Sequence, residues 1–233
     1  MQINKVAFIG KGGVGLLYGS MIARALGSDA VEYVMDDARF ERHAGDALTV
    51  NGKPCVLKSV RASEVTPADL AILTVKTTGL DVALKTMERV VGPNTLIASL
   101  CNGITSEQKI AERFGWKHTV LGICQGMDAV FLDGALTFTN TGEIRFGAAA
   151  GTNPATVAAI DELYTRCGIA HTVESDLRTA CGPNSCSTTA STRPVWPTAG
   201  PTEAPRSRAP SSVAALFPPC ARRLRSPTPR ALS

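Results

Sequence analysis

The segment Lys5 to Gly15, KVAFIGKGGVG, is the clearest indication of the fold in this sequence. Its first part, Lys5 to Ile9, is mostly apolar and predicts a short buried strand. Three glycines follow at G-x-G-x-x-G spacing, and the run from Gly13 to Leu26 then places apolar residues at helical intervals. In such a unit the first glycine makes the turn, the second lets the backbone approach a pyrophosphate, and the third lets the helix pack closely. The context therefore predicts a dinucleotide-binding unit, and a purely structural glycine turn is the alternative.

Downstream of this unit the chain alternates short apolar segments with amphipathic ones, which is typical of βαβ units around a parallel sheet. We expect strands at 31–35, 70–75, 95–100, 119–123 and 171–173, and helices at 80–90, 106–114 and 153–167. One departure is a hairpin expected around Gly142, between 137–141 and 143–146. The predicted fold class is α/β, a Rossmann-type, mostly parallel sheet with helices on both faces, over residues 1–175.

Charged residues after the second predicted strand bear on the type of dinucleotide. Asp36 stands where an acid would hold the ribose hydroxyls of the adenosine, which favours NAD. Arg39 and Arg42 follow closely and would instead suit a 2′-phosphate, which favours NADP. The exposed start of a helix with ordinary solvated charges explains the same residues equally well.

Polar residues follow two further predicted strands. Lys76 comes directly after the strand at 70–75, and Asn102 follows the strand at 95–100. Because open α/β sheets bind ligands at the carboxyl ends of their strands, we expect both residues near the glycine turn. A lysine can donate to ribose or phosphate, and an asparagine amide can donate and accept between cofactor and substrate. Each residue alone would more often be a strand-end contact with solvent.

These residues resemble the ketopantoate reductase (2-dehydropantoate 2-reductase) family. The matching segments are FIGKGGVGLLYG at Phe8–Gly19, LTVKTTGLDVAL at Leu73–Leu84, SLCNGITSEQKIAERFG at Ser99–Gly115 and LGICQGMDAVFLDG at Leu121–Gly134. The resemblance runs from about Lys5 to Ala180 and implies the Rossmann domain of a reductase. Such an enzyme transfers a hydride from NADPH to the 2-keto group of ketopantoate, and the product, pantoate, serves pantothenate and coenzyme A synthesis.

The resemblance also implies roles for single residues. Those expected to cradle the NADPH pyrophosphate are Gly10, Gly12, Gly13, Val14 and Gly15. Lys76 and Asn102 are expected to contact cofactor and substrate, and Ala129 is expected to lie against the cofactor. NADH stays an alternative cofactor, and a related NAD(P)-dependent reductase of another 2-keto or 3-hydroxy acid stays an alternative enzyme.

The composition changes sharply after Ala180. Residues 181–233 hold ten of the 14 prolines, seven arginines and one acid, Glu203. The net charge of this segment, +6, exceeds the +4 of the whole chain, so the first 180 residues are slightly acidic. We therefore expect residues 176–233 to be a disordered Arg/Pro/Ser-rich tail. The basic balance gives no indication that the folded part binds nucleic acid.

Ketopantoate reductases carry a second, helical domain whose first helix supplies a lysine as general acid. That lysine would fall near Pro183 and Asn184, neither of which can protonate an alkoxide. The codons of Cys181–Pro194, read in a shifted frame, permit M-W-x-K-F-L-L-N-x-G-V-N-Q-A, which resembles the missing helix. We predict that one base is lost near codon 180 and that the chain as written is inactive. The alternative is a non-catalytic dinucleotide-binding protein whose genuine tail binds a partner.

Other classes of protein are disfavoured. Seven scattered cysteines without a CxxC pair disfavour a disulfide framework and a zinc site. The N-terminus lacks the pattern of a signal peptide, and no apolar stretch reaches membrane-spanning length. We therefore expect a cytoplasmic protein with a small 2-keto acid substrate and without metal, membrane or nucleic-acid partners. Its oligomeric state has no signature in the sequence.

Overall fold

A computed structural model describes residues 1–101 and 105–175 of the 233-residue chain. The chain divides into two units, Met1–Ser191 and Thr192–Ser233, and every described residue lies in the first. Asn102 and the expected tail, residues 176–233, lie outside the described residues, so the statements about them stay predictions. None of the described helices is long and apolar enough to cross a membrane.

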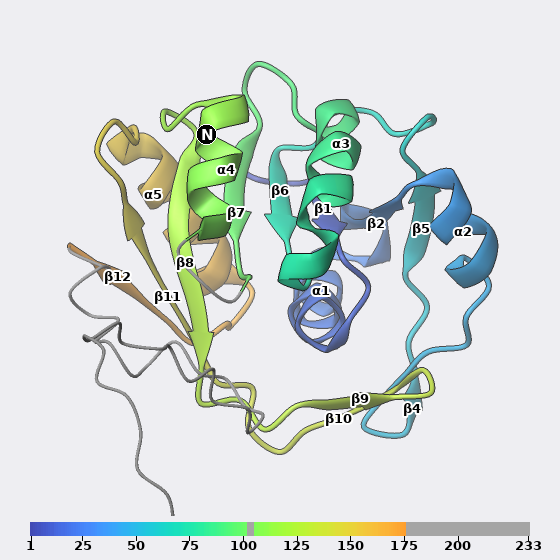
Figure 1. The fold of residues 1–233 in the computed structure, drawn as a ribbon. Helices are drawn as coiled ribbons and strands as arrows, with labels where there is room; N and C mark the ends of the chain where they lie inside the picture. Colours follow the sequence, from blue (N-terminus) through green and yellow to red (C-terminus); the bar gives the residue numbers. More distant parts are fainter. Residues whose placement is uncertain (102–104, 176–233) are drawn as a thin grey trace, which may run out of the picture. The chain divides into compact units, whose positions relative to one another are not determined.

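An eight-stranded central sheet forms the middle layer of the described domain (Figure 1), in the order β12-β11-β8-β7-β6-β1-β2-β5. The strands are β1 (Val6–Ile9), β2 (Val31–Met35), β5 (Lys58–Arg61), β6 (Leu70–Leu73), β7 (Leu96–Ser99), β8 (Thr119–Gln125), β11 (Glu143–Ala148) and β12 (His171–Glu174). All neighbouring strands are parallel except β8 and β11. The six strands from β5 to β8 follow the doubly wound order 3-2-1-4-5-6, which reverses between β1 and β6.

Helices cover both faces of this sheet (Figure 1). They are α1 (Gly13–Leu26), α2 (Asp37–His43), α3 (Leu80–Val90), α4 (Thr105–Phe114) and α5 (Pro154–Arg166), with single 3-10 turns η1 (Ser28–Ala30) and η2 (Thr77–Gly79). α1 and α5 share one buried cluster with the sheet, and α3 and α4 share a second cluster on its other face. The expected fold class, a mostly parallel α/β sheet with helices on both faces, is confirmed.

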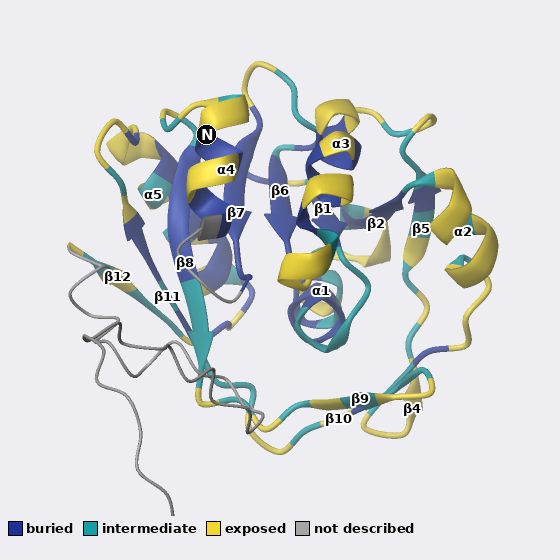
Figure 2. Ribbon diagram, viewed as in Figure 1, coloured by how far each residue is buried: buried dark blue, intermediate teal, exposed yellow. Residues whose placement is uncertain are grey.

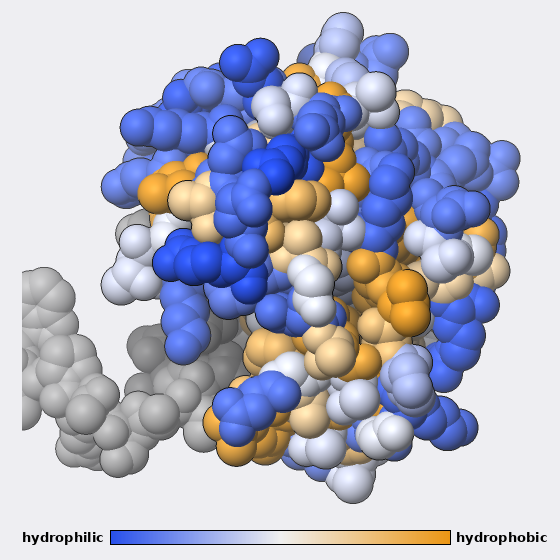
Figure 3. All heavy atoms as spheres, turned by 90° about the vertical axis from the view of Figure 1, so that its right-hand side faces the viewer, coloured by the Kyte–Doolittle hydropathy of each residue, from blue (hydrophilic) through white to orange (hydrophobic). Residues whose placement is uncertain are grey.

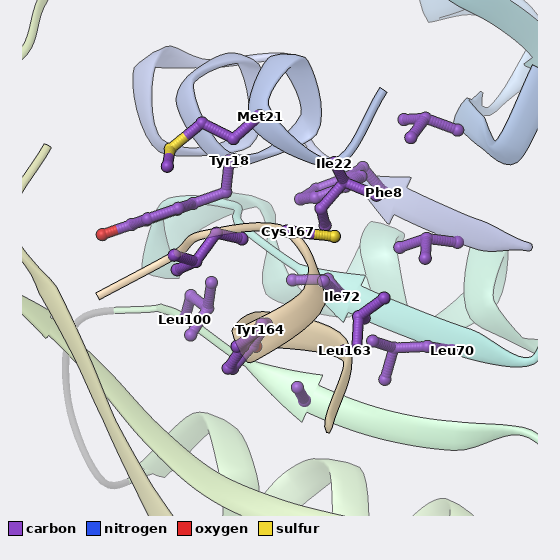
Figure 4. Close-up of a cluster of buried hydrophobic side chains, with 14 of the residues drawn as sticks. Phe8, Tyr18, Met21, Ile22, Leu70, Ile72, Leu100, Leu163, Tyr164 and Cys167 are labelled. Carbon is purple, nitrogen blue, oxygen red and sulfur yellow. The ribbon is translucent and has the colours of Figure 1, made fainter. Parts of the chain in front are cut away.

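The central strands are buried on both faces. Every residue of β1, β6 and β7 is buried, whereas the outer surfaces of the helices are exposed (Figure 2). Figure 4 shows one of the two clusters, where Tyr18 and Ile22 of α1 lie near Phe8 of β1 and near Leu163 and Tyr164 of α5. Strands covered on both sides have near-continuous apolar sequences, which is why the short runs in this chain predict strands.

A second, four-stranded sheet has the order β4-β3-β10-β9. Its strands are β3 (Thr49–Val50), β4 (Lys53–Pro54), β9 (Val130–Leu132) and β10 (Ala135–Thr137). Asn51-Gly52 joins β3 to β4 and Asp133-Gly134 joins β9 to β10, and all four residues have positive φ. This is the backbone of a two-residue hairpin loop, for which Asn-Gly and Asp-Gly are the strongest sequence signals.

Residues 126–142 connect β8 to β11 and are called the arm below. The arm contains β9 and β10 and runs beneath the central strands of Figure 1 toward β4. Asp128 holds its base together, because its Oδ1 accepts the backbone N–H groups of Thr139 (2.9 Å) and Asn140 (2.8 Å). The far end of the arm is fixed by the parallel pairing of β10 with β3.

The prediction of a hairpin around Gly142 is wrong. β10 pairs with β9 and β3, while β11 pairs with β8 and β12. Gly142 has a φ of 68°, and a Cβ on it would lie 2.4 Å from the carbonyl oxygen of Gln125. Glycine is needed there because the two ends of the arm approach closely, not because two strands turn. The other expected strands and helices are present within a few residues of their expected bounds, but β3, β4, β5, β9 and β10 were not expected.

Candidate functional site

The glycine turn between β1 and α1 is tightly packed at two positions and open at a third. Gly10 has a φ of 125°, and a Cβ on it would lie 2.7 Å from the carbonyl oxygen of Thr74. A Cβ on Gly15 would lie 2.1 Å from the carbonyl oxygen of Gly10. A Cβ on Gly12 would have no neighbouring heavy atom within 4 Å. Packing therefore requires glycine at the outer two positions, whereas Gly12 faces open space.

The first turn of α1 begins at this open side. Gly12 is its N-cap, no side chain caps it, and it carries no acid. The first N–H groups of a helix have no acceptor within the helix and, together with the helix dipole, they attract anions. Gly13, Val14 and Gly15 supply such N–H groups here. The turn and helix start therefore fit the pyrophosphate of a dinucleotide.

A cavity of about 730 Å³ lies in front of the glycine turn. It is bordered by the carboxyl ends of β1, β2 and β6, which contribute Gly10, Asp36 and Thr74 among others. α2, α3 and the arm provide its remaining walls. This volume is typical of a small-molecule site, and the position is the point between β1 and β6 where doubly wound sheets bind ligands.

The end of β6 is tied to the glycine turn. The Thr74 hydroxyl donates a hydrogen bond of 2.8 Å to the carbonyl oxygen of Gly10. Lys76, two residues further on, lines the cavity with an exposed side chain and is the N-cap of η2. The structure therefore brings Lys76 to the same cavity as Gly10 and Gly12.

The charged residues after β2 are arranged along α2. Asp36 is the N-cap of α2, and its carboxylate accepts the backbone N–H of Arg39 at 3.0 Å. Asp36 and Arg39 both line the cavity. Arg42 is not among the lining residues, and its Nε donates to the carbonyl oxygen of Ala38 at 3.1 Å. Figure 3 shows the side that carries α2 and β5, where hydrophilic residues surround a more apolar middle and lower part.

Lys11 joins the glycine turn to the end of α2. Its Nζ donates a hydrogen bond of 2.8 Å to the carbonyl oxygen of His43, and both residues line the cavity. Partial burial lowers the pKa of Lys11, and the nearby Asp46 carboxylate opposes this shift. Asp46 is also 3.0 Å from Nδ1 of His43.

The arm contributes the wall opposite the sheet. Phe131 lines the cavity, and its Cβ lies 3.3 Å from the place where a Cβ on Gly13 would stand. Asp133 and Gly134, at the β9–β10 turn, line the cavity beside Ala47. A Cβ on Gly134 would lie 2.7 Å from the Ala47 carbonyl oxygen, so the arm is in close contact with the segment that follows α2.

The predicted site residues are only partly brought together. Gly10, Gly12 and Lys76 line the cavity, and the residues of the first turn of α1 lie directly beside it. Ala129 lies in the arm before β9, partly buried against the core and not among the lining residues. Its expected contact with the cofactor stays a prediction, as does the role of Asn102, which lies outside the described residues.

A buried acid lies at the start of α4, close to the end of β7. Glu107 is 3% exposed, and the Ser106 hydroxyl donates to its Oε2 at 2.9 Å. The Ser106 hydroxyl is also 3.2 Å from the Ser99 hydroxyl. Burial raises the pKa of Glu107 to about 7, despite hydrogen bonds that favour the carboxylate. Across residues 1–101 and 105–175, no group of three or more His, Cys, Asp or Glu side chains is placed to hold a metal ion.

The family model described as ketopantoate reductase PanE/ApbA matches residues 6–151. This span contains the glycine turn, the arm and every residue that lines the cavity, and it is more than half of the chain. The chain belongs to the ketopantoate reductase family. No curated protein matches its sequence.

Solved structures of ketopantoate reductases and a related dehydrogenase share the fold of the described domain. The 2-dehydropantoate 2-reductase from Geobacter metallireducens GS-15 has a TM-score of 0.64 and 21% identity, covering 76% of this chain and 60% of that chain. The dimeric ketopantoate reductase from Staphylococcus aureus has a TM-score of 0.61 and 21% identity, covering 76% and 62%. D-mandelate dehydrogenase with NADH and anilino(oxo)acetate has a TM-score of 0.60 and 22% identity, covering 73% and 57%. This chain spans about 60% of the length of these structures.

The sequence analysis did not predict that the arm forms one wall of the cavity. The Asp133-Gly134 pair between two short apolar runs is a hairpin signal that would have indicated β9 and β10. The nearness of that hairpin to Ala47 has no local signal, because it results from the pairing of β10 with β3.

Proposed function

We propose that this chain derives from an NADPH-dependent reductase of 2-dehydropantoate (ketopantoate), acting in the cytoplasm, and that residues 1–175 are its cofactor-binding domain. The observation that carries the proposal is the open glycine turn at Gly12, which meets a cavity of about 730 Å³ at the reversal point of a doubly wound sheet. Membership of the ketopantoate reductase family supports the reaction.

The proposed binding roles are supported by the positions of the glycines and Lys76 and, for Asn102 and Ala129, only by the family resemblance. The N–H groups of Gly12, Gly13, Val14 and Gly15 face the pyrophosphate, and glycine at 10 and 15 keeps the turn against the helix. Lys76 donates from the end of β6 to ribose or phosphate. Asn102, by the family resemblance, contacts cofactor and substrate. Ala129 lies against the cofactor once it is bound. The cofactor supplies the hydride when bound.

The tail belongs to the same proposal. In the proposed native protein a second, helical domain provides the lysine that protonates the developing alkoxide. Residues 181–233, rich in proline and arginine and without lysine, result from an out-of-frame reading that begins near codon 180. Loss of general acid catalysis typically costs about 10²- to 10⁴-fold in rate, and loss of substrate positioning adds to this. The chain as written therefore binds the cofactor and shows little or no turnover.

The test is a pair of proteins, the 233-residue chain and a version with the reading frame restored after codon 180. Both are titrated with NADPH and NADH by nucleotide fluorescence, and oxidation of NADPH is followed with ketopantoate. We expect both to bind, and only the restored version to turn over. Failure of both proteins to bind any nicotinamide nucleotide overturns the proposed function. Sequencing of the coding DNA across codons 170 to 200 tests the frameshift separately.

A second candidate substrate class has one observation in its favour. D-mandelate dehydrogenase with NADH and anilino(oxo)acetate shares this fold with a TM-score of 0.60. The restored version is therefore also assayed with aromatic 2-keto acids and with NADH. Turnover of these compounds without turnover of ketopantoate assigns the chain to a related reductase. A third outcome favours a non-catalytic binding protein. In that case sequencing shows no lost base, the 233-residue chain binds NADPH tightly, and deletion of residues 176–233 abolishes an interaction with a partner.

A further inference from the structure

Lys11 is the one cation that the glycine turn itself places against the cavity in the described domain. It stands between Gly10 and Gly12, and its ammonium group reaches the carbonyl oxygen of His43 at 2.8 Å. His43 ends α2, which begins directly after Asp36 at the end of β2. In doubly wound dinucleotide-binding folds, this is the side of the site where the adenosine ribose lies. The ammonium group is therefore held beside the place where a 2′-phosphate would distinguish NADPH from NADH.

Arg39 approaches the same place from α2. It precedes His43 by four residues, so the two side chains lie on one face of the helix. Arg39 is exposed and lines the cavity together with Lys11 and His43. Among the ion pairs formed by residues 1–101 and 105–175, none involves Lys11 or Arg39.

The neighbouring acids are mostly engaged elsewhere. Asp46 lies 3.0 Å from the His43 imidazole, and Asp36 caps α2 through the Arg39 N–H. The two other acids of α2, Asp37 and Glu41, pair with Arg61, which also stacks on Phe40. Asp133 is the remaining acid that lines the cavity, and it projects from the β9–β10 turn. Asp46 is close enough to act on the pKa of Lys11, but among the described residues no carboxylate forms an ion pair with Lys11 or Arg39.

We propose that Lys11, together with Arg39, binds the 2′-phosphate of the cofactor and so determines the preference for NADPH over NADH. The inference rests on the proposed function and adds a specificity residue to it. A lysine ammonium has three donors, so Lys11 can keep the His43 carbonyl oxygen while it donates to a phosphate oxygen. Arg39 adds a planar guanidinium that can contact the same phosphate with two donors.

The experiment measures nucleotide affinity of the full 233-residue chain and three variants. The ligands are NADPH and NADH, together with adenosine 2′,5′-bisphosphate and 5′-AMP, which carry only the adenosine end. Lys11→Met is expected to weaken the binding of NADPH and of the bisphosphate by at least about tenfold. A hydrogen bond to a charged group contributes a free energy that corresponds to at least this change in affinity. Binding of NADH and 5′-AMP is expected to change by less than about twofold.

Two further variants separate charge from structure. Lys11→Arg keeps the charge and is expected to retain most of the NADPH preference. Arg42→Met is the matched control, because Arg42 lies on the same helix but does not line the cavity. Salt adds another readout, since NADPH affinity is expected to fall more steeply with ionic strength in the unaltered chain than in Lys11→Met.

The outcomes distinguish the inference from the proposed function. Equal weakening of all four ligands by Lys11→Met shows that Lys11 only supports the end of α2, and this overturns the inference while the proposed function stands. An unchanged NADPH to NADH ratio in Lys11→Met also overturns the inference. Absence of binding by both dinucleotides to the unaltered chain overturns the proposed function, and the inference falls with it.

Discussion

The buried hydroxyl of Tyr33 donates a hydrogen bond of 2.9 Å to the carbonyl oxygen of Gly15. Strand β2 thereby holds the third glycine of the motif, which in turn contacts the first one. The same hydroxyl lies only 2.2 Å from the place where a Cβ on Gly19 would stand. A fourth glycine, outside the motif, is thus required because a tyrosine side chain fills the space beside α1.

The contact between Tyr33 and Gly19 predicts coupled effects on stability. Tyr33→Phe is expected to reduce the free energy of unfolding by about 1 kcal/mol, the typical loss for one hydrogen bond. Gly19→Ala is expected to cost about 1 to 3 kcal/mol through overpacking. In the double variant the second cost is expected to shrink, because the oxygen that the methyl group meets is gone. Urea unfolding of the four proteins measures the coupling, and strictly additive losses would contradict the proposed contact.

The glycine turn predicts different defects at two of its positions. Gly15→Ala places a methyl group 2.1 Å from the Gly10 carbonyl oxygen, where only backbone movement can relieve the clash. We expect it to lower both the free energy of unfolding, by about 2 kcal/mol or more, and nucleotide affinity. Gly12→Ala meets no atom within 4 Å, so its stability cost should be about 1 kcal/mol or less.

The informative comparison is the affinity of Gly12→Ala. Its methyl group projects into the space assigned to the pyrophosphate, so nucleotide binding should fall although the protein stays folded. Thermal unfolding and fluorescence titration of both variants provide the two readouts. If Gly12→Ala binds NADPH as tightly as the unaltered chain, the assignment of the open side of the turn is wrong.

Glu107 predicts a pH dependence of stability. Its pKa in the folded state, about 7, is above the ordinary 4.5, so the folded state binds the proton more tightly than the unfolded state. This group therefore lowers the free energy of unfolding as pH rises from about 4.5 to about 7, by up to about 3 kcal/mol. Glu107→Gln removes that slope, and the variant should gain stability relative to the unaltered chain between about pH 5 and pH 8.

The matched control for Glu107 is Glu112→Gln, which alters an exposed glutamate of the same helix. Urea unfolding midpoints of the three proteins are compared at both pH values. The expectation for the control is a profile parallel to that of the unaltered chain. Parallel profiles for Glu107→Gln as well would mean that Glu107 does not change its proton affinity on folding.

The hydrogen bonds of Asp128 are expected to limit the local opening of the arm. Its carboxylate accepts the Thr139 hydroxyl and the N–H groups of Thr139 and Asn140, and these bonds lower its pKa. Asp128→Ala should speed amide hydrogen exchange across residues 128–142 and weaken nucleotide binding, because Phe131 and Asp133 line the cavity. Asp128→Asn keeps one acceptor oxygen and should exchange at an intermediate rate. Unchanged exchange in Asp128→Ala would show that the strand pairing alone holds the arm.

Much of the fold could be predicted because its segments carry their own periodicity. The run from Gly13 to Leu26 and the strand from Val31 to Met35 have the expected bounds, since one face or both faces of each are apolar. Around Gly142 the local pattern was misleading, because Glu143 pairs with Gln125 across the sheet. A glycine with positive φ looks the same in sequence whether it turns a hairpin or permits close approach.

The candidate site could be predicted only where it lies at strand ends. Gly12 and Lys76 follow strands that the sequence indicates, so the rule for doubly wound sheets brings them together. Phe131 reaches the cavity from a hairpin that pairs with β3, a strand far from it in the sequence. Lys11 occupies a position of the motif that is not fixed as glycine, so the motif itself indicates no role for it. Its hydrogen bond to the His43 carbonyl oxygen depends on where α2 ends.

The pairing of β3 with β10 has a consequence for folding in the cell. One wall of the cavity exists only when segments far apart in the chain have met, so a partly folded chain that contains just the first βαβ unit has the glycine turn without the enclosed site. A bound nucleotide would therefore stabilise the completed domain and not its early intermediates, by mass action. Chains that bind the nucleotide would then be less open to proteolysis than chains in which this wall has not formed.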